Sequence, residues 1–145
     1  MIDKLQSDLQ NAQRSRDSLK VSTLRLLLAE IHNSEIAKTE SLSEQEIIGI
    51  IQREIKKRRE AAAGFMQGKR PEQALKEEDE ADILSNYLPK QLSDEELTKI
   101  VKETITEVGA EDVADMGKVI GMVMGKAKGA ADGARVSALV KEKLQ

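Results

Sequence analysis

The chain has 145 residues, a formal net charge of −3 and no cysteine. This length fits one domain of average size or two small ones, and the lack of cysteine excludes disulfides, zinc–thiolate sites and cysteine nucleophiles. Because the overall charge is negative, any contact with a polyanion has to come from a local basic patch.

The sequence also bears on the cellular location of the protein and on contact with membranes or DNA. No apolar run approaches the roughly 18 residues of a membrane span, and the N-terminal residues contain no apolar signal core. We therefore expect a cytoplasmic protein without a membrane partner. The negative net charge also leads us to expect no DNA partner.

Apolar residues recur at helical spacing and alternating strand patterns are absent, which predicts an all-α fold. Four helices are expected in an N-terminal part, over about residues 2–13, 17–37, from a cap at 43 to the glycines at 64 and 68, and 71–88. Ser43 with Glu46 forms a capping box, and Pro71 suits the first turn of a helix. Leu88 precedes Pro89, which ends the fourth helix.

Three further helices are expected, over about residues 93–108, from 112 or 115 to 126, and from 132 to the end of the sequence. Ser93 with Glu96 forms a second capping box, and Gly109 fits the position after a helix C-terminus. We place the domain boundary between residues 87 and 92. This gives an N-terminal four-helix domain over residues 1–90 and a C-terminal three-helix bundle over residues 91–145.

Acidic residues and the single histidine provide no recognisable catalytic group. The acidic run at 76–82 is expected on the solvent side of the fourth helix, whose inward residues are Ala74, Leu75, Ile83, Leu84 and Leu88. His32 alone cannot form a histidine-rich metal site, and no serine pocket accompanies it. We expect no catalytic residue, metal or cofactor.

A basic run at 56–59 lies on the third helix, and Arg53, Lys56 and Lys57 form the cluster that the helical turn brings together. One interpretation is a solvated helix with ion pairs to Glu54 and Glu60. The other is an anion or nucleic-acid contact. The neighbouring acids favour the first interpretation because they dilute the local field.

The glycines Gly117, Gly121 and Gly125 recur four residues apart inside an expected helix. An interior glycine costs about 1 kcal/mol relative to alanine, so three on one stripe indicate a close approach to that face. Either a neighbouring helix or a nucleic-acid backbone can make that approach.

Basic side chains surround this stripe, and Asp132 opposes them; they are Lys118, Lys126, Lys128 and Arg135. The loop at 128–131 also places backbone N–H groups before a helix N-terminus, a favourable position for phosphate. Nearby aromatics are absent, which argues against base stacking and favours recognition of a folded RNA by shape and backbone. Helix packing alone and packing combined with RNA binding both remain open.

This tail also carries a family resemblance. It resembles the signature of the GatB/YqeY family at 115–121, Lys126, Lys128, Gly129, 131–133 and Val136. The segments 24–31, 54–60, 68–70 and 87–92 support the resemblance over nearly the whole chain, which looks like a stand-alone YqeY-type protein. Two positions depart from the pattern: Ile120 replaces a frequent methionine, and Ala130 replaces a frequent lysine and so removes a positive charge.

The resemblance implies a two-part helical protein whose C-terminal part is similar to the tail of the B subunit of the tRNA-dependent amidotransferase. That enzyme amidates Glu-tRNA(Gln) or Asp-tRNA(Asn), and its tail touches the outer corner of the tRNA. By this resemblance the tRNA contact surface comprises Gly117, Lys118, Gly121, Lys126, Lys128, Gly129, Asp132 and Gly133, which we extend to Arg135.

The amidotransferase's kinase-like body and its glutaminase have no counterpart in this sequence. We therefore expect a non-catalytic tRNA-binding or accessory protein whose partners are tRNA and a tRNA-modifying or amidotransferase enzyme. Two alternatives remain: a helical protein–protein interaction module, and a component of a glutamine-dependent carbon–nitrogen ligase.

Overall fold

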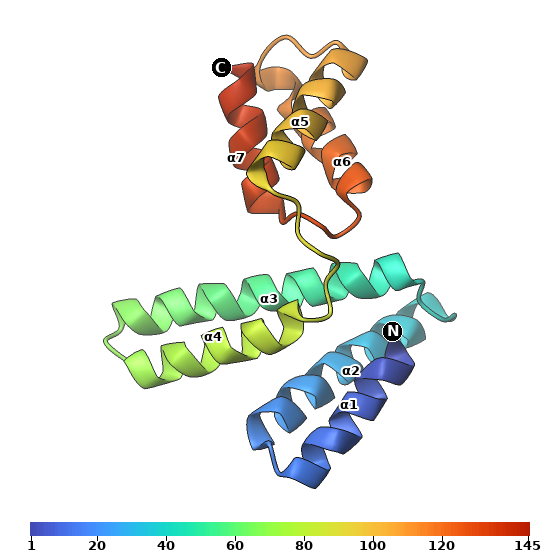
Figure 1. Cartoon of the computed structure of the whole chain (residues 1–145), viewed down its shortest axis with the longest axis vertical. Helices are drawn as coiled ribbons and strands as arrows, with labels where there is room; N and C mark the ends of the chain where they lie inside the picture. The colour runs from blue at the N-terminus through green and yellow to red at the C-terminus, as the bar shows by residue number, and fades with distance from the viewer. The chain divides into compact units, whose positions relative to one another are not determined.

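The computed structural model describes residues 1–145 and consists of helices, short turns and loops without a strand (Figure 1), so the predicted all-α fold is confirmed. Its elements are α1 (Ile2–Ser15), α2 (Ser18–Lys38), α3 (Glu44–Gln67), α4 (Pro71–Ser85), α5 (Asp94–Val108), the short 3₁₀ helix η1 (Val113–Asp115), α6 (Met116–Ala127) and α7 (Gly133–Leu144). The chain divides into two compact units, Met1–Leu88 and Pro89–Gln145, each with its own apolar core.

Local signals account for most helix ends. Ser43 and Glu46 make the full predicted capping box, and Pro71 opens α4. Ser93 accepts a hydrogen bond from the Glu96 backbone N–H, but the reciprocal bond of a capping box is absent. The fourth helix ends at Ser85, three residues before the expected Leu88, because the last residues before Pro89 form a turn.

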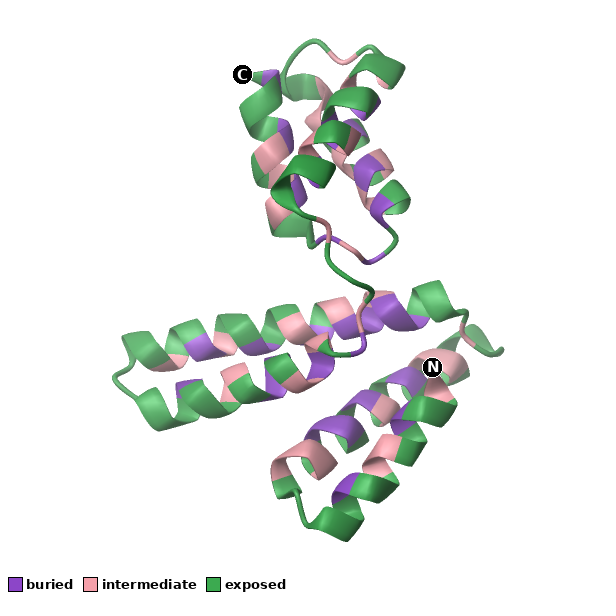
Figure 2. Cartoon of the chain, viewed as in Figure 1, coloured by how far each residue is buried: buried purple, intermediate pink, exposed green.

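Unit 1 is built from the α1–α2 pair and the α3–α4 hairpin, with α2 packing on α3 and α4. Its core consists of aliphatic side chains from all four helices and one tyrosine: Leu5, Leu24, Leu27, Ile31, Ile47, Ile50, Ile51, Leu84 and Tyr87. Figure 2 shows the buried residues running along the inner faces of these helices. The Tyr87 hydroxyl donates a hydrogen bond to Asp8, which joins the segment after α4 to α1.

The α3–α4 hairpin packs along small side chains. Ala62, Ala74 and Ala81 are buried, and small side chains at such positions allow two helices to approach closely. Leu75 is 62% exposed, so the expectation that it faces inward is wrong. Ala74, one position earlier, takes the inward place.

Ion pairs hold the two hairpin helices together. The buried Arg58 guanidinium donates to Glu54 Oε2 at 2.8 Å on α3 and to Glu80 Oε2 at 3.2 Å on α4. Arg59 pairs with Glu78 and Asp82. The expectation that the acidic run of α4 faces solvent is therefore wrong for Glu80, which is buried because Arg58 holds it on the interhelical side. Asp82 is exposed and Glu78 is partly exposed.

Unit 2 is a bundle of three helices around an aliphatic core. Its buried members are Leu97, Val101, Val119, Val123, Ala127, Ala131, Val136, Val140 and Leu144. The chain entering α5 is joined to the α6–α7 loop, since the Leu92 N–H donates to the Ala130 carbonyl and the Gln91 amide donates to the Gly129 carbonyl. No helix in the structure has the length and apolar character needed to cross a membrane.

We predict that Arg58→Ala destabilises unit 1 by about 3 kcal/mol, because two buried carboxylates lose their cation. Arg59→Ala is the matched control, since its half-exposed pairs contribute at most about 1 kcal/mol. Urea unfolding of both variants measures the difference. Equal free energies of unfolding for the two variants would contradict a stabilising role for the buried pairs.

A pH dependence follows from Glu54. Burial raises its pKa, but hydrogen bonds from Arg58 and Lys57 outweigh burial and leave the pKa below its ordinary value of 4.5. The ionised carboxylate therefore stabilises the fold above that value, and the contribution disappears as the pH falls below it. We expect Glu54→Gln to reduce the loss of stability between about pH 5 and pH 3, measured by urea unfolding at each pH.

Candidate nucleic-acid interface

Helix α6 separates its side chains sharply into two faces. Val119, Val123 and Ala127 are buried in the core of unit 2. Gly117 and Gly121 are exposed, as is Gly125, because glycines four residues apart stay on the side of the helix opposite these core positions. The outer face of α6 therefore presents helix backbone with few side chains, and we call these three glycines the glycine face.

No neighbouring helix covers the glycine face. A Cβ atom placed on Gly117, Gly121 or Gly125 would have no other atom within 4 Å outside the local helix backbone. A close approach by another helix of the chain is thus not the reason for these glycines. Their backbone is open to a molecule from outside.

Two of the cations expected to contact RNA instead form hydrogen bonds within unit 2. Lys126 Nζ donates to Glu107 Oε2 at 2.6 Å and to Thr104 Oγ1 at 3.0 Å, both on α5. Arg135 Nη2 donates to the Leu92 carbonyl at 2.9 Å and to Asp94 Oδ1 at 2.8 Å. These bonds tie α6 and α7 to α5 and to the chain entering it.

Two other cations remain available at the glycine face. Lys118 follows Gly117 in the first turn of α6, and Lys128 caps the C-terminal end of the helix. Both side chains belong to exposed residues, and neither forms an ion pair.

The backbone of Lys128 is unusual for a lysine. Its φ of 48° and ψ of 48° are left-handed, a conformation that favours glycine at a helix end. An L-residue with a side chain costs about 1–2 kcal/mol in this region. The chain therefore keeps a lysine at a position where glycine would be more stable.

The loop after α6 differs from the expectation of free N–H groups. The Lys128 and Ala130 amides donate to the Met124 and Ala127 carbonyls. Gly129 is buried with a φ of 86°. Two of the amides expected to contact phosphate are therefore already paired within the chain, and a phosphate contact on this loop stays a prediction.

The N-terminus of α7 is capped by a side chain of the chain itself. The side chain of Asp132 accepts a hydrogen bond from the Arg135 backbone N–H at 2.8 Å, with Gly133 in the exposed first turn. A carboxylate thus already lies where a phosphate was expected. Asp132 and Gly133 thus shape the start of α7.

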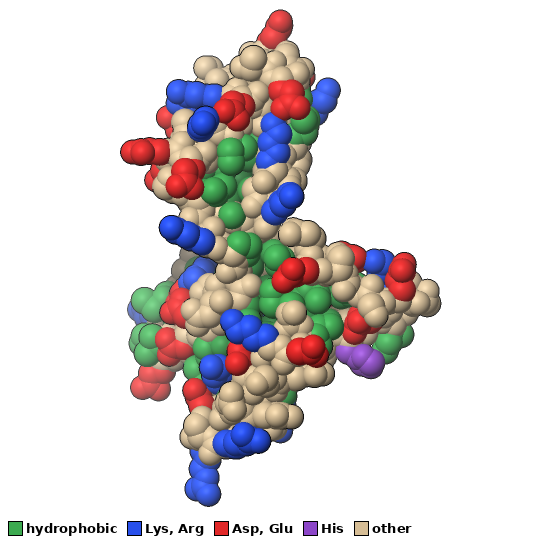
Figure 3. Space-filling view, turned by 45° about the vertical axis from the view of Figure 1, so that its right-hand side comes forward, with side chains coloured by type: hydrophobic (Ala, Val, Ile, Leu, Met, Phe, Trp, Pro, Cys, Tyr) green, Lys and Arg blue, Asp and Glu red, His purple; other side chains and the backbone are tan.

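In the basic cluster on α3, one of the three cations forms an ion pair and two do not. Lys57 lies 3.3 Å from Glu54, whereas Arg53 and Lys56 are exposed and form no ion pair. Glu60 forms no ion pair either, so the expected partner there is wrong. On the face that Figure 3 shows, positive and negative side chains are interspersed.

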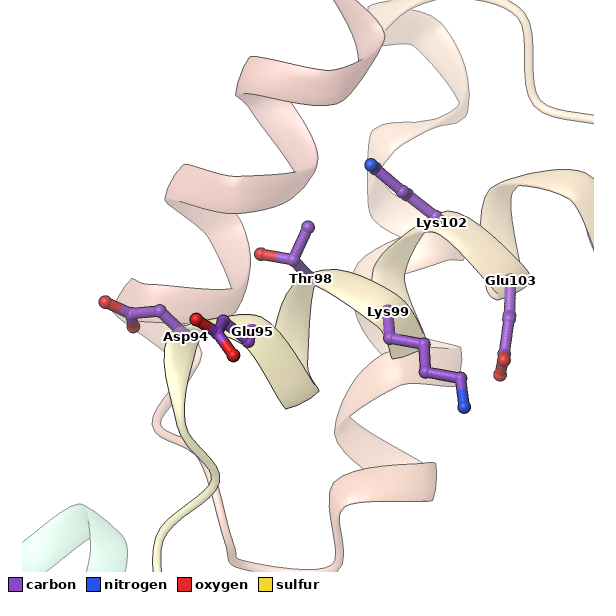
Figure 4. A pocket seen from close by; sticks show the side chains of 6 residues that line it. All are labelled: Asp94, Glu95, Thr98, Lys99, Lys102 and Glu103. Atoms are coloured by element: carbon purple, nitrogen blue, oxygen red, sulfur yellow. The ribbon is translucent and has the colours of Figure 1, made fainter.

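One groove, on the outer side of α5, is lined by side chains that fan out from a single helix (Figure 4): Asp94, Glu95, Thr98, Lys99, Lys102 and Glu103. No three His, Cys, Asp or Glu side chains are grouped to hold a metal ion. His32 lies exposed on α2.

These features define the class of protein: a helical protein of two units with an open glycine face. Comparison with protein families gives its membership: the model of the YqeY-like proteins matches residues 2–144. The chain belongs to this family, which confirms the recognition made from the glycine-rich tail.

Curated relatives share the family and extend beyond this chain. The chain is 34% identical over 85 residues to "Altered inheritance of mitochondria protein 41, mitochondrial" of Vanderwaltozyma polyspora, covering 58% of this chain and 46% of that protein. The protein of the same name in Pyrenophora tritici-repentis is 29% identical over 108 residues, covering 72% and 59%. The chain thus spans about half the length of the curated relatives it matches.

The comparison also corrects the expected location. The relatives with assigned names are mitochondrial proteins, which overturns the expectation of a cytoplasmic protein. That expectation rested on missing signal and membrane segments, and such absences do not identify a compartment.

We predict that Gly121→Ala stabilises unit 2 by about 1 kcal/mol, because alanine is the better helix former and its methyl group meets no neighbour. Gly109→Ala is the control and is expected to destabilise, since Gly109 has a φ of 68° at the end of α5. Thermal and urea unfolding measure both effects. A loss of stability in Gly121→Ala would show that the glycine face has a packing role.

Proposed function

We propose that this YqeY-like protein is a non-catalytic RNA-binding protein that binds tRNA through the glycine face of α6. The observation that carries the proposal is the exposure of Gly117, Gly121 and Gly125, beside the unpaired cations Lys118 and Lys128. Three helix-weakening residues on one open face need a reason outside the fold of unit 2.

The chemistry of this face fits a sugar-phosphate backbone. Without side chains, the helix backbone can come into direct contact with ribose and phosphate groups, and two lysines can neutralise phosphates at its two ends. Both aromatic residues, Phe65 and Tyr87, lie in unit 1, so unit 2 has no platform for base stacking. Recognition would therefore depend on the shape and backbone of a folded RNA.

The choice of tRNA rests on the resemblance of the tail to the B subunit of the tRNA-dependent amidotransferase. On this proposal the protein assists a tRNA-modifying or amidotransferase enzyme and supplies no chemistry itself. Gly129, Asp132 and Gly133 shape the loop beside the contact, while Lys126 and Arg135 hold the bundle that displays it. Arg53 and Lys56 on α3 offer a weaker, separate contribution.

The test is the affinity of the full chain for fluorescent tRNA transcript, measured by anisotropy from 50 to 200 mM KCl. For Lys118→Gln with Lys128→Gly, we expect roughly tenfold weaker binding and a salt slope smaller by about 0.7–0.9 for each lysine. The matched control is Lys141→Gln with Lys143→Gln in the last turn of α7, which removes the same charge from exposed residues. This control should retain most of the affinity and slope.

A second variant tests the glycine face without changing the charge of the protein. Gly121→Leu places a bulky side chain in open space on the glycine face, so the fold is retained while the backbone is shielded from RNA. We expect it to weaken tRNA binding. Lack of tRNA binding by the unmodified chain, or unchanged binding in both this variant and the double lysine variant, would refute the proposed function.

A further inference from the structure

We propose that the turn between α1 and α2 is a second phosphate-binding surface, which engages the same RNA as the glycine face. This inference rests on the proposed RNA binding and adds a contact in unit 1. We call it the turn surface and define it by Arg14, Arg16, Lys20 and Arg25. These side chains belong to the end of α1, its cap and the first half of α2.

Charge is concentrated at this turn. Residues 11–29 contain these four cations and one carboxylate, a net charge of +3 within a chain of net charge −3. The single carboxylate, Asp17, accepts a hydrogen bond from the Lys20 backbone N–H at the start of α2. None of the four cations forms an ion pair, so their charge is available to a partner.

A shallow groove of about 690 Å³ lies at the same turn. It is lined by Gln13, Arg16, Ser18, Val21, Ser22, Arg25 and Leu26. This lining contains two guanidinium groups and no carboxylate. Three other grooves, on α5, between α2 and α3, and between α3 and α4, each include at least one carboxylate.

The arginines suit phosphate in particular. A guanidinium offers a planar fork of N–H groups that binds two phosphate oxygens at once. Val21 and the 56% exposed Leu26 add apolar surface against which a ribose can pack. Figure 3 shows positively charged side chains at the tip of unit 1 that holds the α1–α2 turn, and others spread over the rest of that face.

Arg16 repeats the backbone feature seen at Lys128. It ends α1 with a φ of 58° and a ψ of 35°, in the left-handed region where glycine is favoured. Its backbone N–H donates to the Ala12 and Gln13 carbonyls, bonds that glycine would also make. The helix end therefore does not require the arginine side chain, which leaves the side chain free for binding.

Two contacts on one chain reinforce each other. Once the glycine face is bound, the turn surface meets RNA at the high effective concentration set by the linkage between the units. Loss of the turn surface should therefore weaken binding to tRNA without abolishing it.

The experiment compares Arg16→Gly with Arg25→Gln against the unmodified full chain, using the same tRNA transcript and salt series. We expect unchanged or higher melting temperature, affinity lower by about three- to tenfold, and a smaller salt slope. Lys69→Gly with Lys76→Gln is the matched control, because it also removes two exposed cations from unit 1, and Lys69 likewise has a positive φ of 59° but lies at the α3–α4 turn. It should retain the affinity and the slope.

The outcomes separate the two proposals. If the unmodified chain binds tRNA and the Arg16/Arg25 variant retains full affinity and slope, the turn surface is not an RNA contact. An equal loss in the Lys69/Lys76 control would also overturn it, because the effect would then reflect total charge. If the unmodified chain does not bind tRNA, the proposed function itself fails.

Discussion

The orientation of α6 in its bundle is the constraint on which the rest of the structure depends. Val119 and Val123 fill the core of unit 2, and this fixes which side of the helix meets water. The glycines lie on that side by their spacing alone. A rotation of the helix that buried them would expose both valines, so the open backbone is a direct result of how the core is packed.

Much of the fold could be predicted from local patterns, and the errors have a common cause. Caps, proline and apolar periodicity act within a few residues, so Ser43, Pro71 and Gly109 could be assigned directly. Leu75 and Glu80 could not, because their environment depends on how closely α3 approaches. That distance is set by small residues on both helices, which periodicity alone does not reveal.

The candidate site was less predictable for the same physical reason. Sequence reasoning could count the cations near the glycines, but the partners of Lys126 and Arg135 come from α5 and the chain before it, 19 and 41 residues away. The turn surface was missed because its cations are dispersed between apolar and polar residues. Only the reversal of the chain between α1 and α2 brings Arg16 and Arg25 to one groove.

Left-handed backbone at Arg16, Lys69 and Lys128 has a consequence for engineering this family. Selection for thermal stability would enrich glycine at these helix ends, as it would enrich alanine on the outer side of α6. Such selection would yield proteins that are more stable but lack cations at these helix ends. Selection for thermal stability would therefore favour glycine at these positions, whereas selection for ligand binding would favour lysine or arginine.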